Sequence, residues 1–116
     1  MCNLASWPGL PRACGAYGLS ADELKASLRQ HNPIDRLAPL ARAKVPIFHI
    51  HGDKDRVVPL DANSRTVAER YKTLGGPITL KVIENQGHNM WPGWFQNQEL
   101  VDFVIKHAAG NAGKQE

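Results

Sequence analysis

The chain has 116 residues, of which 42% are hydrophobic and 22% are charged, and its formal net charge is +3 at pH 7. This composition is ordinary for a globular protein and argues against general disorder. The basic residues are scattered rather than clustered, so the sequence predicts no nucleic-acid partner. Two cysteines, Cys2 and Cys14, are too few for a disulfide framework or a zinc ribbon, and we expect two free thiols.

The first residues lack the basic start and apolar core of a signal peptide, and no apolar run reaches the roughly 18 residues of a membrane span. We therefore expect no membrane span. If the chain is part of a longer protein, an export signal could lie upstream of residue 1. The sequence thus leaves localisation undetermined.

Residues 1–19 contain three glycines and two prolines, which predicts a loop or lid connection that follows a strand ending near residues 2–4. Ser20 and Glu23 form a capping box, because the hydroxyl can accept from the third helical amide while the carboxylate reaches back. A helix should therefore begin after Ser20 and end before Pro33.

An apolar run at residues 45–50 is typical of a buried strand, and a second such strand is predicted at residues 79–83. Between them, Asp61 can cap a helix that the glycine pair at residues 75–76 should end. The apolar face of this helix is expected to comprise Val67, Tyr71 and Leu74. The strand, helix, strand order predicts a right-handed crossover between two parallel neighbouring strands.

The carboxyl-terminal part of the chain is expected to form a last helix that packs on the sheet. Its apolar stripe should comprise Leu100, Val101, Val104, Ile105 and Ala108. The polar, glycine-containing tail at residues 110–116 is expected to fray.

An acid and a histidine follow the ends of the two predicted strands. Asp55 and His88 are 33 positions apart, but parallel strands bring their carboxyl ends to one edge of a sheet, where active sites gather. A carboxylate on one imidazole nitrogen fixes the tautomer and stabilises the imidazolium that forms when the other nitrogen accepts a nucleophile's proton. The alternative is that Asp55 caps a turn and His88 is a surface loop residue.

The phrases HGDKDRVVP at residues 51–59 and QGHN at residues 86–89 resemble the last third of an α/β-hydrolase. The resemblance covers residues 32–109 and implies that Asp55 is the acid and His88 the base of a Ser-Asp-His triad. Within the superfamily, the APL approach before the first strand and the RYK-x-LGG helix end are most similar to the prolyl oligopeptidase and acetyl-esterase-like branches. The resemblance therefore implies a serine hydrolase that cleaves an ester or peptide bond through an acyl-enzyme.

The nucleophile of such an enzyme is missing from the sequence. The chain contains no Gly-x-Ser-x-Gly elbow, and the nearest imitation, Ser6, is followed two residues later by a proline. An α/β-hydrolase domain is also normally about twice this long. We therefore expect a carboxyl-terminal fragment that supplies the acid and base and is inactive alone.

Two further arrangements compete with this interpretation. Asp53 is a rival acid, but a residue directly after a glycine turn more often bonds nearby backbone amides, and we expect that role for Asp53. The cluster His49-x-His51-x-Asp53 resembles the zinc-binding run of metallo-β-lactamase-like hydrolases, which would make the protein a metal-dependent hydrolase. Lys54 stands where that family has another histidine, so we assign no metal site. A non-catalytic fragment that binds a partner chain is the third alternative.

Trp91 and Trp94 flank the proposed base. They could wall a substrate pocket, since pockets are lined mainly by apolar rings, or they could only pack the start of the last helix. Both interpretations stay open at this point.

The sequence predicts an α/β fold: a partial α/β-hydrolase in three α-β-α layers, with the last two or three parallel strands and their helices. We divide it into a lid or connection with a helix at residues 1–44, the part that bears acid and base at residues 45–109, and the tail at residues 110–116. A small-molecule ester or peptide is the expected substrate, with no cofactor. An unpaired apolar strand edge would favour self-association.

Overall fold

The computed structural model describes residues 2–6 and 9–112, so the last part of the predicted tail lies outside the described residues. The elements in chain order are α1 (Gly9–Tyr17), α2 (Ala21–Ala26), α3 (Leu28–His31), η1 (Pro33–Asp35), α4 (Ala38–Arg42), β1 (Ile47–Gly52), η2 (Asp61–Arg65), α5 (Thr66–Thr73), β2 (Ile78–Ile83), η3 (Pro92–Trp94) and α6 (Gln98–Ala112).

The helix α1 occupies a part of the chain that we predicted to be a loop, so that prediction was wrong. Pro11 does not prevent the helix, because it lies in the first turn, where backbone N–H groups have no intrahelical partner. The helix ends before Gly18, which has a left-handed φ of 64°. Residues 2–6 form turns and contain no strand, so the expected strand end is also absent there.

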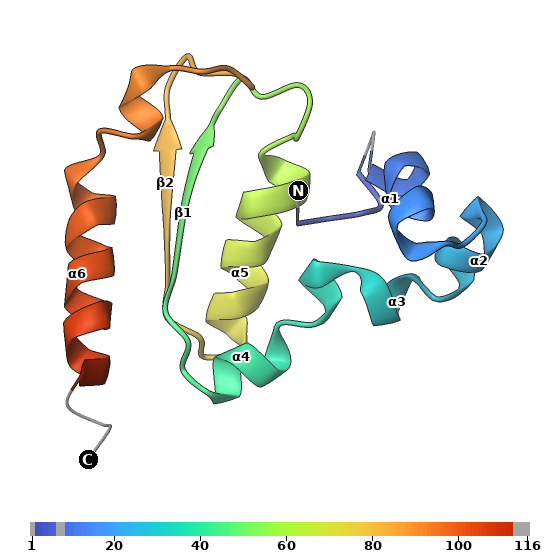
Figure 1. Ribbon diagram of the computed structural model, residues 1–116, viewed down its shortest axis with the longest axis horizontal. Coiled ribbons are helices and arrows are strands. Elements are labelled where there is room, and N and C mark those ends of the chain that lie inside the picture. Colours follow the sequence, from blue (N-terminus) through green and yellow to red (C-terminus); the bar gives the residue numbers. More distant parts are fainter. Residues whose placement is uncertain (1, 7–8, 113–116) are drawn as a thin grey trace.

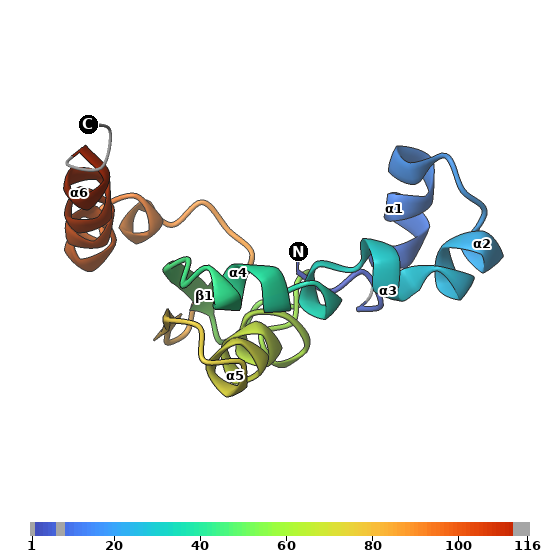
Figure 2. The ribbon, with the colours of Figure 1, turned by 90° about the horizontal axis from the view of Figure 1, so that it is seen from below.

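The predicted capping box is present at the start of α2. The Ser20 hydroxyl accepts from the Glu23 amide at 3.2 Å, and the Glu23 carboxylate accepts from the Ser20 amide at 2.8 Å. The helix breaks at Ser27 and continues as α3, which ends at Asn32 as expected from the following proline. In a view from below, α1, α2 and α3 extend away from the sheet (Figure 2).

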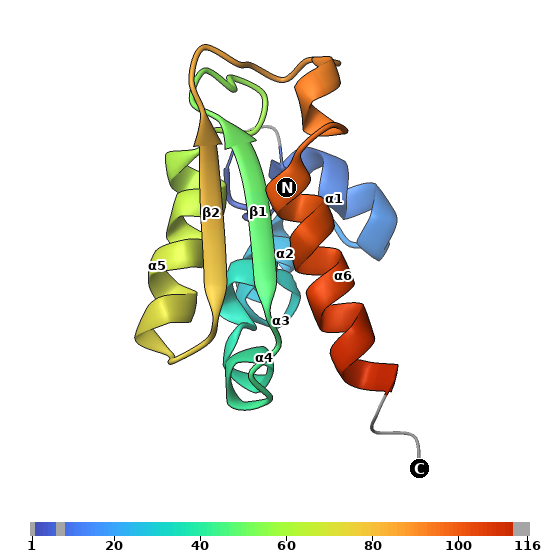
Figure 3. The ribbon, with the colours of Figure 1, turned by 90° about the vertical axis from the view of Figure 1, so that its left-hand side faces the viewer.

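The two strands β1 and β2 are parallel neighbours, with Ile47 opposite Ile78 and Gly52 opposite Ile83. Both lie close to their predicted positions. The helix α5 connects them and covers one face of the sheet, while α6 covers the other (Figures 1 and 3). The predicted three-layer arrangement of an α/β fold is therefore present, and the carboxyl ends of both strands lie at the same edge.

The core lies between α5 and the segment that leads into β1. Its buried side chains are Ile34, Leu37, Ala41, Val67 and Tyr71. The Tyr71 ring is fully buried, and its hydroxyl donates to the Val45 carbonyl oxygen at 2.6 Å. Burial raises the pKa of this hydroxyl, so it stays protonated as a donor at neutral pH.

The start of α5 differs from the prediction that Asp61 caps it. A π-helical turn, η2, precedes α5, and Asp61 is its first helical residue rather than its cap. The Asp61 carboxylate accepts from the Arg65 side chain at 2.7 Å instead of from a backbone amide. Leu74 was also misplaced on the buried face, because it follows the last helical residue and its side chain is exposed. Gly75, with a φ of 77°, ends the helix as predicted.

Most of the predicted apolar stripe of α6 is exposed, and of its residues only Leu100 is half-buried. Phe103 packs on Phe48 of β1 with ring centroids 5.4 Å apart, and His107 packs on Phe103. Val104 and Ile105 are 55% and 60% exposed. The aromatic pair sets the rotation of the helix, because a Phe ring buries more area than a β-branched side chain. The helix also extends to Ala112, beyond the predicted start of the tail.

The molecule is open for its size. Its radius of gyration is 16.1 Å, against about 13 Å for a compact domain of this length. Its accessible surface is 7802 Å², against roughly 6300 Å² for a folded monomer of this mass. Within residues 2–6 and 9–112, none of the helices has the length and apolar character that crossing a membrane requires.

Candidate active site

The loops after β1 and β2 are held together by a close backbone approach at Gly52. The Lys54 amide donates to the Gln86 carbonyl oxygen at 3.0 Å, and the Asp53 amide donates to the Ile83 carbonyl oxygen at 3.1 Å. A Cβ atom added at Gly52 would lie 2.1 Å from that same Gln86 oxygen. Only glycine therefore allows the two loops to meet at this distance.

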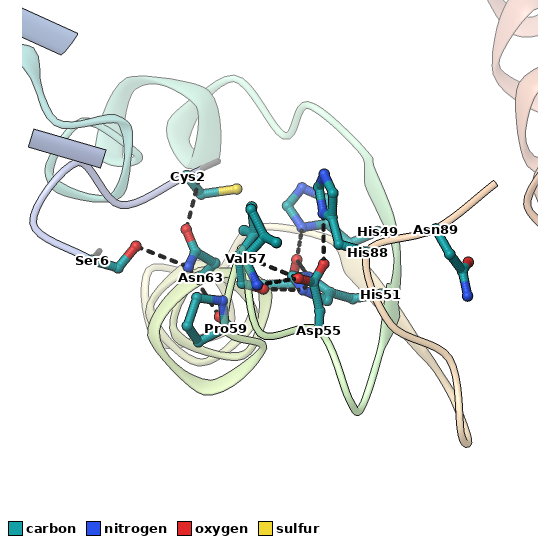
Figure 4. Close-up of polar contacts among 12 residues, drawn as sticks. Cys2, Ser6, His49, His51, Asp55, Val57, Pro59, Asn63, His88 and Asn89 are labelled. Carbon is teal, nitrogen blue, oxygen red and sulfur yellow. Dashed lines mark hydrogen bonds and ion pairs between the residues drawn. The ribbon is translucent and has the colours of Figure 1, made fainter. Parts of the chain in front are cut away.

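This approach brings the two predicted catalytic residues together. His88 Nδ1 lies 3.0 Å from Asp55 Oδ2, across 33 positions of sequence (Figure 4). The Asp55 side chain is 9% exposed, whereas that of His88 is 56% exposed. The other Asp55 oxygen, Oδ1, accepts from the Val57 and Val58 amides at 2.9 Å and 2.8 Å. The carboxylate is thus anchored on one oxygen and faces the imidazole with the other.

The surroundings of Asp55 favour its ionised form. Burial alone would raise the pKa, but the Val58 amide, the His88 ring and the Val57 amide together outweigh burial and hold the pKa of this carboxyl below its ordinary value of 3.8. Asp55 is therefore a carboxylate at neutral pH. A carboxylate can orient the His88 ring and stabilise a positive charge on it.

Two cavities adjoin His88. One, of about 280 Å³, is lined by Asp55, His88, Asn89 and Trp94 among others. The other, of about 440 Å³, lies between α1 and the loop that carries Asp55, residues 53–60, which we call the acid loop. Its lining is mostly small or apolar and comprises Leu4, Gly9, Ala13, Ala16, Tyr17, Val57 and Val58 beside Arg12 and His88. A substrate bound at the His88 ring can therefore extend in two directions.

The roles expected for Asp53 and Asp55 differ in one respect from those observed. Asp53 is exposed, and its carboxylate makes no hydrogen bond to any residue in the described part of the chain. Its expected bonds to nearby amides are made by Asp55 instead. The reason is that Asp55 lies where the backbone of residues 57 and 58 turns its amides inward, two and three positions ahead.

The two tryptophans have different positions. Trp94 lines the smaller cavity, and its indole N–H donates to the Asn89 carbonyl oxygen at 3.1 Å. Trp91 packs edge-on against Trp94, with ring centroids 5.3 Å apart, and does not line either cavity beside His88. A substrate-binding role stays a prediction for both, and the geometry favours Trp94.

The histidines of β1 converge on a hydroxyl group rather than on a common metal position. His49 Nδ1 and His51 Nδ1 lie 3.0 Å and 2.7 Å from Ser64 Oγ. Among residues 2–6 and 9–112, no three His, Cys, Asp or Glu side chains are placed to hold a metal ion. No local sequence pattern shows that η2 lies against β1, so the sequence did not predict Ser64 beside these two histidines.

Ser6, the nearest sequence match to a nucleophile, is occupied elsewhere. Its hydroxyl donates to the Asn3 carbonyl oxygen at 2.8 Å and accepts from the Asn63 amide group at 3.1 Å. Asn63 is fully buried and also binds the Cys2 and Asn3 amides through Oδ1 and the Pro59 carbonyl oxygen through Nδ2 (Figure 4). This cluster ties the amino-terminal segment to the end of the acid loop.

Comparison with known proteins points to the same part of the chain. Residues 25–108, which include Asp55 and His88, match the family described as phospholipase/carboxylesterase. The chain belongs to this family. The match supports the α/β-hydrolase superfamily, and the prolyl oligopeptidase branch has no support from it. The helix α1 precedes the residues matched to the phospholipase/carboxylesterase family, and it contributes part of the lining of the larger cavity.

One curated relative is methylphloroacetophenone synthase from Cladonia uncialis. It is 35% identical over an alignment that covers 54% of this chain and 3% of the relative. The chain thus spans only a small part of the length of that protein. No solved structure matches the chain at a significant level.

Proposed function

We propose that Asp55 and His88 are the acid and base of a Ser-Asp-His triad that hydrolyses a carboxylic ester through an acyl-enzyme. The contact of 3.0 Å between His88 Nδ1 and Asp55 Oδ2 carries the proposal. An ionised carboxylate that contacts one ring nitrogen of a half-exposed histidine leaves the other nitrogen free to exchange protons with a substrate. Membership of the phospholipase/carboxylesterase family favours an ester over a peptide bond.

In this mechanism the proton moves only at His88. Nδ1 keeps its proton and donates a hydrogen bond to the Asp55 carboxylate, while Nε2 takes the proton of the attacking serine hydroxyl. The ring then carries a positive charge, which the Asp55 carboxylate stabilises. The same Nε2 returns the proton to the oxygen of the leaving alcohol as the acyl-enzyme forms. Water is activated in the same way when the acyl group is released.

The nucleophile does not come from any Gly-x-Ser-x-Gly motif in these 116 residues. We infer that a segment outside this sequence provides it, together with the donors that bind the oxyanion. The chain alone should therefore not hydrolyse p-nitrophenyl acetate above the background rate. Serine-dependent turnover by the pure chain would contradict this part of the proposal.

The two cavities beside His88 suggest where the arms of an ester would lie. The base must stand next to the leaving oxygen, so the acyl and alcohol groups have to diverge from the His88 ring. The cavity of about 440 Å³ has a mostly apolar lining, which suits an apolar arm. The cavity of about 280 Å³ contains Asn89 and Trp94 and suits a smaller or more polar arm.

The decisive experiment uses the protein encoded by the reading frame extended upstream of residue 1. Asp55→Asn and His88→Ala should each lower kcat/KM for p-nitrophenyl acetate by roughly 10³- to 10⁴-fold, the scale for loss of a triad member. Asp53→Asn is the matched control, because it removes an exposed carboxylate from the same loop. A comparable loss in Asp53→Asn, or full activity in Asp55→Asn, would refute the assignment. Peptide substrates assayed in parallel decide between esterase and peptidase activity.

A further inference from the structure

Behind Asp55 lies a hydrogen-bonded chain that the proposed triad does not use. It consists of His49 and His51 on β1 and Ser64 on η2. The two histidines are two positions apart, so they project from the same face of the strand, toward the helix that covers it. His51 is 9% exposed and Ser64 is 5% exposed. His51 and Ser64 are therefore enclosed, while His49 is half-buried.

The hydrogen-bond partners determine which atoms carry protons. His51 Nε2 lies 2.8 Å from the Val58 carbonyl oxygen, which can only accept, so Nε2 must be protonated. In the neutral ring, His51 Nδ1 then accepts the hydroxyl proton of Ser64. The Ser64 oxygen can in turn accept from His49 Nδ1, which must therefore carry a proton. Burial lowers the pKa of His49, and the repulsion that two neighbouring imidazolium charges would suffer at His49 and His51 lowers it further, so the His49 ring stays neutral.

The series of hydrogen bonds that begins at His49 ends at the acid loop. Val58 accepts from His51 through its carbonyl oxygen and donates to Asp55 Oδ1 through its amide. His51 Nε2 also lies 3.6 Å from Asp55 Oδ2, the oxygen that faces His88. Val58, one of the two residues whose amides bind the carboxylate, is thus itself bound by His51. A change in the orientation of the His51 ring would displace Val58 and thereby the Asp55 carboxylate that Val58 binds.

We propose that His51 is a positioning residue for Asp55, and that Ser64 and His49 fix the tautomer in which His51 can act. The His49–Ser64–His51 chain keeps the His51 Nε2 proton directed at the acid loop. Asp55 consequently presents Oδ2 to His88 in one geometry. This inference rests on the proposed triad for its functional meaning, but the proton positions and the anchoring of Asp55 follow from the contacts alone.

Two other roles for the cluster are less consistent with the structure. Ser64, His51 and Asp55 have the order of contacts of a catalytic triad, but the Ser64 hydroxyl is buried between two imidazoles and cannot reach a substrate. A metal site would need three converging ligands, which the described residues do not provide. The two hydrogen bonds of the Ser64 hydroxyl to His49 and His51 are enough to explain why both imidazole rings point at it.

The first test needs no variant. Long-range ¹H–¹⁵N correlation spectra of the chain at pH 7 should show His51 in the Nε2–H tautomer and His49 in the less common Nδ1–H tautomer. In Ser64→Ala, His49 should lose its preference for Nδ1–H, because the acceptor of that proton is gone. An Nε2–H tautomer for His49 in the parent chain would contradict the proposed hydrogen bond from His49 Nδ1 to the Ser64 hydroxyl oxygen and would overturn the inference.

The second test measures the effect on the acid through the ¹³C carboxyl titration of Asp55. Ser64→Ala and His51→Leu should raise the pKa of Asp55 by roughly half a unit to one unit, because the amide bonds to its carboxylate loosen. His51→Gln should retain much of the parent value, since its amide N–H can still bind the Val58 carbonyl oxygen. Ser27→Ala removes a hydroxyl that binds the Glu23 carbonyl oxygen at the break between α2 and α3, and it should leave the Asp55 titration unchanged.

An unchanged Asp55 titration in folded Ser64→Ala and His51→Leu would show that His51 is only a strand residue and would refute the inference. If one of these two variants fails to fold, the other variant and the tautomers of the parent chain still decide the question. Neither measurement depends on turnover. Loss of the triad assignment in the activity assay, with these results intact, would refute the proposed function and leave the anchoring of Asp55 standing.

Discussion

The close approach at Gly52 offers the sharpest test of how the site is assembled. In Gly52→Ala, the new Cβ atom would lie 2.1 Å from the Gln86 carbonyl oxygen and 2.7 Å from its carbon, both of them backbone atoms. No side chain can rotate away to relieve this contact. The loop at residues 84–88 must therefore move away from the end of β1.

The loss of stability is set by the hydrogen bonds that this movement weakens and by the crowding that remains. Two backbone hydrogen bonds are disturbed, Asp53 to Ile83 and Lys54 to Gln86, worth about 0.5–1.5 kcal/mol each. Overpacking in a closely packed place costs typically about 1–3 kcal/mol more. We expect Gly52→Ala to lower the free energy of unfolding by about 2–6 kcal/mol, a large part of the stability of a small domain.

Urea unfolding followed by circular dichroism measures this change in the free energy of unfolding. Gly15→Ala is the matched control, because its Cβ atom would meet nothing within 4 Å inside α1. This substitution should leave stability unchanged or raise it by up to about 1 kcal/mol, since alanine favours helices. Equal stability of Gly52→Ala and the parent chain would refute the idea that the two loops meet at a distance only glycine allows.

Three other predictions concern the amino-terminal cluster, the acid and the open surface. Asn63→Ala should lower the free energy of unfolding by about 2–5 kcal/mol in urea, because the Cys2 and Asn3 amides lose their acceptor and the Pro59 carbonyl oxygen its donor; Asn89→Ala, an exposed change, should cost far less. The lowered pKa of Asp55 means that its contribution to stability is fully present above the ordinary value of 3.8 and is lost as pH falls through the lower folded value, so Asp55→Asn should flatten the fall in stability measured from pH 5 downward. The chain should self-associate at about 100 μM in light scattering. Within the described residues, the edge of β1 that faces away from β2 has no partner strand, and Val104 and Ile105 are exposed. A monodisperse monomer that binds no hydrophobic dye would argue against that surface being available.

Much of the local structure could be predicted from the sequence because it depends on interactions within a few residues. The capping box at Ser20, the stop before Pro33 and the left-handed Gly75 each satisfy or interrupt backbone hydrogen bonds of their own turn. The two strands were also predicted closely, since a short apolar run bounded by a proline and a glycine is typical of a buried strand.

The errors had two causes, one in the local interpretation of prolines and one in packing between distant residues. The helix α1 was missed because its prolines and glycines suggested a loop, and Pro11 is harmless only at the position it occupies in the first turn. The stripe of α6 was misassigned because Leu100, Val101, Val104 and Ile105 form an apolar face that is as convincing in sequence as the one containing Phe103. Packing of Phe103 on Phe48 decided the rotation of the helix.

For the candidate site, the sequence by itself singled out Asp55 and His88 as candidate acid and base, because each lies in a short phrase at the end of a predicted strand. Only the tertiary structure decided that Asp55 rather than Asp53 binds the amides of the turn, and that Ser64 joins His49 to His51. The physical reason is one of range. A phrase of a few residues encodes its own turn and hydrogen bonds, whereas the meeting of β1 with η2 depends on the register of the strands and the rotation of a helix, which the whole packed core sets.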